Sequence, residues 1–219
     1  MKNKALVLFS GGQDSTTCLY WAIDKFGSAS VSAVAFDYGQ RHKIELVSAK
    51  KIAKMAGVKL DILPISTFSA LGGNALTGSE KVKTGNAKKT GLPNTFVPGR
   101  NLIFLTFAAA HAYTVGIHDL VTGVSEADYS GYPDCRKGTI KALETSLSLG
   151  MDYKFKIHTP LINLSKKKTV LLAKKLNAFP ALALSHTCYN GKRPPCGKCP
   201  ACILRKKGFD EAGLIDPIG

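Results

Sequence analysis

The stretch Ser10-Gly11-Gly12-Gln13-Asp14-Ser15-Thr16 decides the fold of this chain. It follows an apolar run at residues 5–9 and leads into residues 15–26, where apolar residues repeat with a helical period. A strand, a glycine turn and a helix in this order are typical of nucleotide-binding α/β proteins. Adjacent glycines let backbone amides converge on one point, and the hydroxyls of Ser10, Ser15 and Thr16 lie beside a helix N-terminus. The stretch predicts a phosphate-binding loop; the alternative is an ordinary glycine-rich turn.

Asp14 is not expected to bind phosphate, because a carboxylate repels it. The two expected roles are a ligand for Mg²⁺ bridging nucleotide oxygens and a cap of the following helix. The loop is not a Walker loop, since no Gly-x-x-x-x-Gly-Lys-Ser/Thr occurs in the chain. It resembles the Ser-Gly-Gly-x-Asp-Ser-Thr loop of the PP-loop ATP pyrophosphatases, which cradle the outer phosphates of ATP and activate a substrate at the α-phosphate.

Composition favours one domain with a sizeable core, because the chain has 219 residues of which 45% are hydrophobic. No apolar run approaches the roughly 18 residues of a membrane-spanning helix, and the start of the chain leads directly into a strand pattern. We therefore expect a cytoplasmic protein. The formal charge of +15 favours a lysine-rich surface that attracts anionic small molecules, with a nucleic-acid partner as the alternative.

Apolar runs alternate with segments of helical period, which predicts an α/β fold with a doubly wound parallel sheet. The predicted strands are residues 6–9, 31–36, 59–64, 120–123 and 155–158. The predicted helices are residues 15–26, 43–56, 101–115, 139–149 and 166–176. We expect Gly57 to end the second helix, Ser165 to cap the last one, and the apolar segment 101–115 to be buried.

Two further segments complete the expected organisation. Residues 66–99 carry six glycines and little periodicity, which predicts a mobile loop that is either a surface excursion or a lid ordered by ligand. Residues 1–180 are predicted to form the nucleotide-binding domain, and residues 181–219 a metal-binding C-terminal segment.

Four of the six cysteines follow the spacing C-x7-C-x2-C-x2-C. We expect no export signal, so reduced thiolates on a metal are favoured over disulfides. Four thiolates suit tetrahedral Zn²⁺ and leave no position for a catalytic water, which indicates a structural site. Spacing alone leaves an iron–sulfur cluster as the alternative. The predicted ligands are Cys188, Cys196, Cys199 and Cys202, whereas Cys18 is expected in the core and Cys135 near the substrate.

The fourth predicted strand ends in a polar stretch, residues 123–136, that is either a substrate site or a generic loop. A guanine-like base presents adjacent N–H donors, which one carboxylate can accept, and an aromatic ring can stack on its face. Asp134 and Tyr132 suit these two roles, and Arg136 suits a two-point contact with a substrate carboxylate. Asp128 and Ser130 complete the predicted substrate-binding set.

The chain as a whole resembles the 7-cyano-7-deazaguanine synthases, PP-loop enzymes of queuosine biosynthesis. The resemblance runs from Phe9 to about Gly208. It rests on six motifs in order: FSGGQDSTTCL at 9–19, FDYGQRH at 36–42, VPGRN at 97–101, ADYSGYPDCR at 127–136, TPL at 159–161, and the four-cysteine tail.

The resemblance implies a ligase that forms a carbon–nitrogen bond. It implies ATP-dependent conversion of 7-carboxy-7-deazaguanine and ammonia to the nitrile, through an activated carboxylate and an amide, by a homodimer with bound zinc. Its implied catalytic residues are Asp14, Lys166 and Arg100. The residues implied to bind ATP are Phe9, Ser10, Gly11, Gly12, Gln13, Asp14, Ser15, Thr16, Thr17, Phe36, Asp37 and Tyr38.

For some of these residues, the sequence pattern alone fits a second interpretation equally well. Phe36, Asp37 and Tyr38 would line the adenine pocket, although a tight turn accounts for them equally well. Lys166 could reach the phosphates or be solvated at the surface. The chain has Lys168 where the family pattern has a carboxylate, so no role is assigned to that position.

Two other functions fit parts of the sequence. The same ATP site could serve a tRNA substrate, as in thiolating or lysidine-forming relatives, but no appended RNA-binding domain is visible, so direct tRNA binding is not expected. Alternatively, the tail could be a zinc ribbon that docks nucleic acid or a protein. Salt-dependent RNA binding would favour either alternative.

Overall fold

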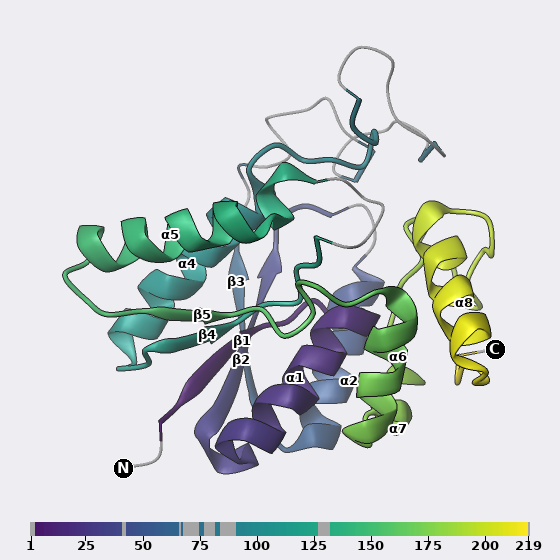
Figure 1. Cartoon of the computed structure of the whole chain (residues 1–219), viewed down its shortest axis with the longest axis horizontal. Coiled ribbons are helices and arrows are strands. Elements are labelled where there is room, and N and C mark those ends of the chain that lie inside the picture. The colour runs from purple at the N-terminus through teal and green to yellow at the C-terminus, as the bar shows by residue number, and fades with distance from the viewer. Residues whose placement is uncertain are drawn as a thin grey trace.

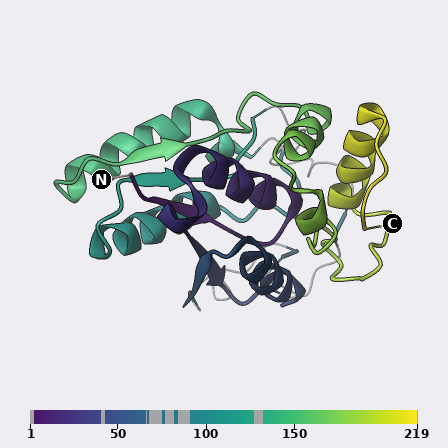
Figure 2. The ribbon, with the colours of Figure 1, turned by 90° about the horizontal axis from the view of Figure 1, so that it is seen from below.

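The computed structural model describes residues 3–40, 43–65, 67, 75–76, 82–83, 91–126 and 132–218. Its centre is a five-stranded parallel sheet in the order β3-β2-β1-β4-β5 (Figures 1 and 2). The strands are β1 Ala5–Leu8, β2 Val31–Asp37, β3 Lys59–Pro64, β4 Asp119–Val121 and β5 Lys156–His158. The predicted α/β class and all five predicted strands are confirmed, with boundaries shifted by up to two residues.

The central strand β1 is apolar throughout because both its faces are covered. Ala5, Leu6 and Val7 are at most 1% exposed, as expected for the middle of a parallel sheet flanked by helices. Leu8 is its last residue paired with β2, and Val7 its last residue paired with β4. The strand order reverses between β1 and β4, so a crevice opens beyond their carboxyl ends, where ligands of such sheets bind.

Helices cover both faces of the sheet. The first face carries α1 Gln13–Phe26 and α2 Ile44–Ala56, with α6 Lys166–Lys175 and α7 Phe179–Leu182 beside them (Figure 1). The second face carries α4 Arg100–Thr114 and α5 Lys137–Gly150. Short 3-10 turns occur at Ser28–Ser30 and Pro133–Cys135. As predicted, Gly57 ends α2 in a left-handed conformation, and the Ser165 side chain caps α6.

The expectation that residues 101–115 form a wholly buried helix is wrong. Leu105, Ala108 and Ala112 of α4 pack into the core, but Phe107 is 47% and Tyr113 51% exposed. The helix lies on an outer layer of the fold, so its second face points away from the sheet. Because the segment is apolar on all sides, its sequence does not reveal that one face of the helix is buried and the other is exposed.

The last helix, α8 Pro200–Ala212, packs against α6. The two helices approach so closely that a Cβ on Gly208 would lie 2.9 Å from the Cβ of Lys166. Phe209 of α8 shares a small core with Val170 and Leu182. The C-terminal segment is thus held beside the start of α6, and the domain boundary expected after residue 180 falls inside α7.

Two predictions depend on regions that the structure describes only in part. Of the loop expected at residues 66–99, the described portions are 67, 75–76, 82–83 and 91–99, so its mobility stays a prediction. Among the helices in the described portion of the chain, none combines the length and the hydropathy needed to cross a bilayer.

Candidate active site

The predicted phosphate-binding loop connects β1 to α1, and the amides of Ser10 and Gly12 donate to the hydroxyls of Ser15 and Ser10. Gly12 is the N-cap of α1 and receives no side-chain cap, which leaves the helix N-terminus available to an anion. Gly11 has a φ of +79°, and a Cβ there would lie 2.6 Å from both the Ala49 N and the Glu45 O of α2. Position 11 therefore requires glycine for two reasons: its positive φ, and the close contact of the loop with α2.

Hydroxyl groups organise the loop from within. The Oγ atoms of Ser10 and Ser15 lie 3.1 Å apart, and Ser15 Oγ donates to the Gly12 carbonyl at 3.2 Å. In contrast, three buried polar atoms of the described loop have no hydrogen-bond partner: Gln13 Nε2, Asp14 Oδ1 and Thr16 Oγ1. A buried polar atom without a partner costs about 1–3 kcal/mol. Their concentration in one turn indicates that a polar ligand supplies the missing bonds.

Asp14 and Lys166 meet across the entrance to the loop. Lys166, the first residue of α6, places its Nζ 2.6 Å from Asp14 Oδ2. The lysine side chain is 14% exposed, so the alternative of a fully solvated Lys166 does not apply. Helix capping by Asp14 is also not observed, because Gly12 is the N-cap of α1. The pair thus presents one ammonium group and one unpartnered carboxylate oxygen to the crevice, which suits phosphate and a divalent cation respectively.

A cavity of about 320 Å³ opens beyond the sheet at this point. Its lining includes the loop, Asp14 and Lys166, the end of β2, the start of α4, and residues 186–189 of the C-terminal segment. This volume lies in the usual range for small-molecule sites. One cavity therefore joins the phosphate-binding loop to groups from distant parts of the chain.

The end of β2 brings its backbone to the edge of this cavity. Val34 O accepts from Phe9 N at 2.8 Å on the β1 side, and Asp37 O accepts from Ile65 N at 2.8 Å on the β3 side. Phe36 lies two residues after Val34, so its backbone groups face the β1 side beyond Leu8, where β1 has ended. The Phe36 ring stacks on Phe104 with centroids 4.7 Å apart. This arrangement fits an adenine ring bound edge-on to the strand.

Gln40 and Asp37 complete the description of this strand end. The Gln40 side chain accepts from Tyr38 N at 2.8 Å and donates to Phe36 O at 3.3 Å, which fixes the turn. Asp37 forms an ion pair with Lys43 at 3.1 Å and is not among the described residues that line the cavity. Its predicted contact with ATP stays a prediction.

Arg100 lies at the centre of an aromatic cluster on the cavity wall. Its guanidinium group hydrogen-bonds the Tyr38 hydroxyl and interacts with Tyr132, Tyr189 and Glu45. Burial alone would lower the pKa of Arg100, but these neighbours raise it above its usual range. Burial raises the pKa of Tyr38 to about 12 and that of Glu45 to about 7. Arg100 is therefore a fixed positive charge in the cavity.

Of the predicted substrate-binding residues that the structure describes, Tyr132 lines the cavity, whereas Asp134 and Arg136 do not. Tyr132 lines the cavity and hydrogen-bonds Thr95 Oγ1 at 2.6 Å. The Asp134 carboxylate instead accepts from Asn101 N at 3.0 Å in the first turn of α4, and Arg136 is exposed as the N-cap of α5. Asp128 and Ser130 lie outside the described residues. Substrate roles for these four residues stay predictions.

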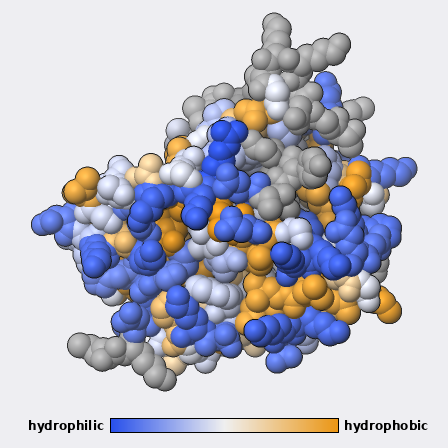
Figure 3. Space-filling view, viewed as in Figure 1, coloured by the Kyte–Doolittle hydropathy of each residue, from blue (hydrophilic) through white to orange (hydrophobic). Residues whose placement is uncertain are grey.

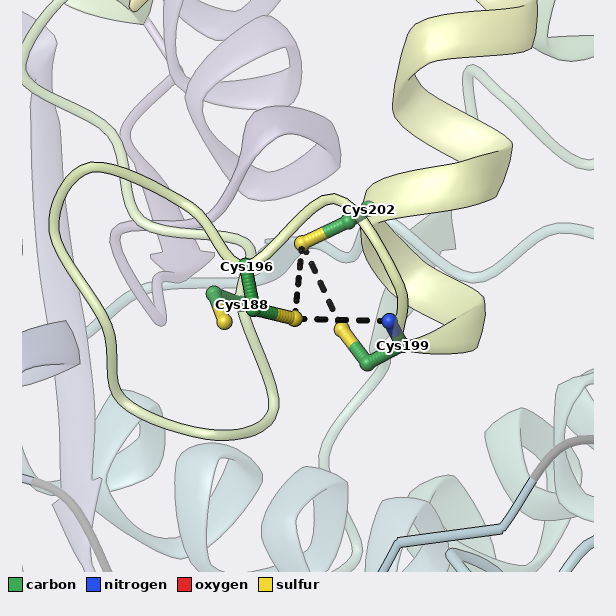
Figure 4. Close-up of side chains that lie close together, drawn as sticks. All are labelled: Cys188, Cys196, Cys199 and Cys202. Atoms are coloured by element: carbon green, nitrogen blue, oxygen red, sulfur yellow. Dashed lines mark hydrogen bonds between the residues drawn. The ribbon is translucent and has the colours of Figure 1, made fainter.

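The four predicted metal ligands come together at the start of α8 (Figure 4). Their sulfur atoms all lie within 4.8 Å of one another, with Cys199 and Cys202 3.4 Å apart and Cys196 and Cys202 4.0 Å apart. Tetrahedral Zn–S bonds of about 2.3 Å place sulfur atoms about 3.8 Å apart, so the set fits Zn²⁺. Burial opposes ionisation of Cys196, yet N–H groups of Lys198 and Asn190 lower the pKa of its thiol to about 6.

His186 connects this cysteine cluster to the phosphate-binding loop. Its backbone N donates to Gly11 O at 2.9 Å, and its Nε2 lies 2.8 Å from Cys188 O. The sequence pattern predicted no role for this residue, nor for the other cavity-lining groups of Gln40, Glu45, Thr187 and Tyr189. A signal existed for some of them, because each lies within a few residues of a motif already recognised.

The other two cysteines lie apart from the cluster. Cys18 is fully buried in the core, as predicted. Cys135 lines the cavity, with its sulfur 3.2 Å from Asn101 Nδ2.

This combination of a reversed parallel sheet and an uncapped glycine loop defines a nucleotide-binding α/β protein of the PP-loop type. The chain belongs to the family described as queuosine biosynthesis protein QueC, whose pattern it matches over residues 4–213. A protein of Chromobacterium violaceum named 7-cyano-7-deazaguanine synthase is 63% identical over 98% of this chain and 92% of its own length. A protein of the same name from Laribacter hongkongensis is 62% identical over 98% of this chain and 93% of its own length.

A solved structure supports the fold independently. The predicted subunit of a tRNA methyltransferase from Methanocaldococcus jannaschii superposes with a TM-score of 0.51 at 20% identity. The match covers 78% of this chain and 74% of that chain. At this identity the likeness concerns the fold alone.

Proposed function

We propose that this protein is a ligase that converts 7-carboxy-7-deazaguanine and ammonia to 7-cyano-7-deazaguanine with ATP. The observation that carries the proposal is one cavity whose lining includes Gln13 and Asp14, each with an unpartnered polar atom, together with an arginine and three tyrosines. The loop suits the phosphates of ATP, and the arginine and tyrosines suit an aromatic acid. The names of the 62–63% identical relatives support the same reaction.

The chain's own groups divide the work of holding ATP. The amides after Gly12 and the hydroxyls of Ser10, Ser15 and Thr16 would bind the phosphates, while the backbone of Phe36 would read the adenine edge. Lys166 would stabilise negative charge that develops on the phosphates, where electrostatic catalysis gains most. Mg²⁺ held by Asp14 Oδ1 would supply further charge neutralisation at the same oxygens.

The reaction needs activation because a carboxylate has no good leaving group. The substrate carboxylate oxygen would attack a phosphorus atom of ATP, and a phosphoanhydride bond at that phosphorus would break so that the displaced phosphate or nucleotide portion leaves as an oxyanion. The resulting mixed anhydride gives ammonia a carbonyl carbon to attack, and the ammonia nitrogen loses a proton as the amide forms. The activated oxygen leaves with phosphorus, and an amide remains. A second activation, now of the amide oxygen, lets the remaining carbon–oxygen bond break with loss of two protons from nitrogen, which forms the nitrile. Arg100 would hold the carboxylate in place for the first step.

We also propose that the four cysteines hold one structural Zn²⁺. Its contribution would be to fix residues 186–189 on the cavity wall through His186, without contact with the reacting atoms. The homodimer and the cytoplasmic location implied by the family belong to the same proposal. Light scattering tests the first by looking for twice the 23.4 kDa mass of the chain.

The basic charge of the chain suits an anionic small molecule as well as a nucleic acid. Figure 3 shows hydrophilic residues spread over the viewed face with hydrophobic ones between them. The charge of +15 is thus consistent with a lysine-rich surface around an anion site.

Mass spectrometry of the reaction tests the proposed function. The protein is incubated with ATP, ammonia and 7-carboxy-7-deazaguanine, and the expected product is the nitrile, with its nitrogen derived from ¹⁵N-labelled ammonia. An unlabelled product, or no nitrile while a tRNA substrate becomes modified, would contradict the proposal.

A further inference from the structure

Glu45 is a carboxylate in the cavity that the proposed reaction does not yet use. It lies in the first turn of α2, directly against the glycine loop, because the Glu45 carbonyl is the atom that a Cβ on Gly11 would approach within 2.6 Å. Two carboxylates line the cavity within the described residues, Asp14 and Glu45. Asp14 is engaged with Lys166, so Glu45 alone has a carboxylate not committed to another side chain there.

The side chain of Glu45 is half-buried and lines the cavity. The interactions that set its charge state are burial and the distant positive charge of Arg100, without a hydrogen bond from any neighbour in the described parts of the chain. Burial raises the pKa of this carboxyl to about 7. Such a group gains strongly from a ligand that brings N–H donors to it.

Arg100 and the tyrosines define what ligand would fit beside Glu45. Arg100 interacts with Glu45 electrostatically, but no direct ion pair joins the two among the described contacts. A positive group and a negative group are therefore held apart on one cavity wall, with Tyr38, Tyr132 and Tyr189 around them. A flat ring that carries an acid on one side and N–H donors on the other complements this arrangement.

We propose that Glu45 is a specificity-determining residue that accepts the ring N–H and the 2-amino group of the deazaguanine while Arg100 contacts its carboxylate. This inference rests on the proposed function for the identity of the base. Glu45 is favoured over Asp134, because the Asp134 carboxylate is already occupied by Asn101 N at the start of α4. The two donors of a guanine-like pairing edge match the two oxygens of one carboxylate.

The test removes the interaction once by changing Glu45 and once by removing the 2-amino group of the ligand. Binding of 7-carboxy-7-deazaguanine and of its analogue without the 2-amino group is measured by calorimetry for wild type, Glu45→Gln and Glu45→Asp. Wild type should prefer the natural base by about 10- to 100-fold, and Glu45→Gln should lose most of this preference. Glu45→Asp should restore part of it, and the KM for ATP should stay unchanged in both variants. Glu211→Gln, an exposed change on α8, is the matched control.

Three results would overturn the proposal. The first is an unchanged preference in Glu45→Gln, including the case in which kcat falls, since that pattern would make Glu45 a proton acceptor. The second is collapse of the preference in Asp134→Asn instead. The third is absence of any preference in wild type. Because binding is measured apart from turnover, a failure to form nitrile would contradict the proposed function, while the binding ratios would still decide the role of Glu45.

Discussion

The two carboxylate oxygens of Asp14 differ in their contacts. Its Oδ2 is bound to Lys166 at 2.6 Å, whereas its Oδ1 is buried without a partner. The second oxygen is available to a cation that the phosphates would also bind. The motif predicts a cation-binding role for this residue, because a carboxylate beside phosphates is stable only when a cation lies between them.

Replacement of Asp14 by Asn is predicted to reduce ATP turnover by at least about 100-fold, since a neutral amide binds a divalent cation weakly and loses the ion pair with Lys166. Asp24→Asn on the exposed side of the same helix is the control and should retain full activity. Steady-state kinetics measures both variants, and circular dichroism checks that they fold. Unchanged turnover in Asp14→Asn would remove Asp14 from the mechanism.

Glu45 is predicted to weaken the fold at alkaline pH. Its pKa is about 7 in the folded state against an ordinary value of 4.5, so the folded state binds its proton more tightly. Stability from this group is therefore fully present below about pH 4.5 and is lost as the pH rises through 7. Glu45→Gln should unfold at higher denaturant concentration than wild type at pH 8, and the difference should shrink toward pH 5. A difference independent of pH would show that the surroundings of this carboxyl do not raise its pKa.

The sequence predicts the turn conformation of Gly11 but not its close contact with α2. Its turn conformation follows from the motif, whereas the approach of α2 depends on tertiary packing that a sequence pattern does not contain. The same limit explains why Asp134 was expected in the cavity and Glu45 was not. Both carboxylates lie in segments that follow strands, and only packing places Glu45, and not Asp134, among the described residues that line the cavity.

Gly11→Ala is predicted to destabilise the protein well beyond the conformational cost alone. Gly57→Ala provides that reference, because Gly57 also has positive φ but no atom lies within 4 Å of its Cβ position. The reference should cost about 1–2 kcal/mol in unfolding free energy, and Gly11→Ala more, since its Cβ meets backbone of α2 at 2.6 Å. Chemical denaturation measures both. Equal losses would mean that loop and α2 are less closely packed.

At the level of elements, strands and helices could be predicted from the sequence wherever the buried residues repeat with the period of a strand or a helix. β3 begins and ends where the sequence predicts, since Gly57 separates it from α2. Helix α8 was missed because its buried face includes Cys202 and Arg205 as well as Phe209. Arg205 is 2% exposed and bonded to Asp216 at 2.7 Å, so a polar residue occupies a core position that no hydropathy pattern reveals.

The C-terminal element is predicted to depend on its metal. Cys202→Ser should lose bound zinc and lower the midpoint of thermal unfolding, because the cluster would no longer hold residues 186–189 against the loop. Cys18→Ser is excluded as a control by its burial in the core, whereas Cys135→Ser lies outside the cluster and should keep one zinc per chain. Elemental analysis and calorimetry measure the two properties. Full zinc content in Cys202→Ser would contradict the ligand set.

The whole molecule brings together groups from both ends of the chain. The loop after β1, the start of α4 and the segment before α8 all contribute to one cavity, and His186 bonds the last of these to Gly11. The sequence predicted each part separately, because each has a local motif. Their convergence follows from the reversed strand order, which places the carboxyl ends of β1 and β4 beside one another.

A crystal structure with a non-hydrolysable ATP analogue and Mg²⁺ tests the central claim most directly. We predict that the triphosphate lies on the amides following Gly12, that Asp14 Oδ1 and Thr16 Oγ1 gain ligand contacts, and that the adenine lies against Phe36. A nucleotide bound elsewhere, with this loop empty and its three polar atoms still unpartnered, would contradict the account.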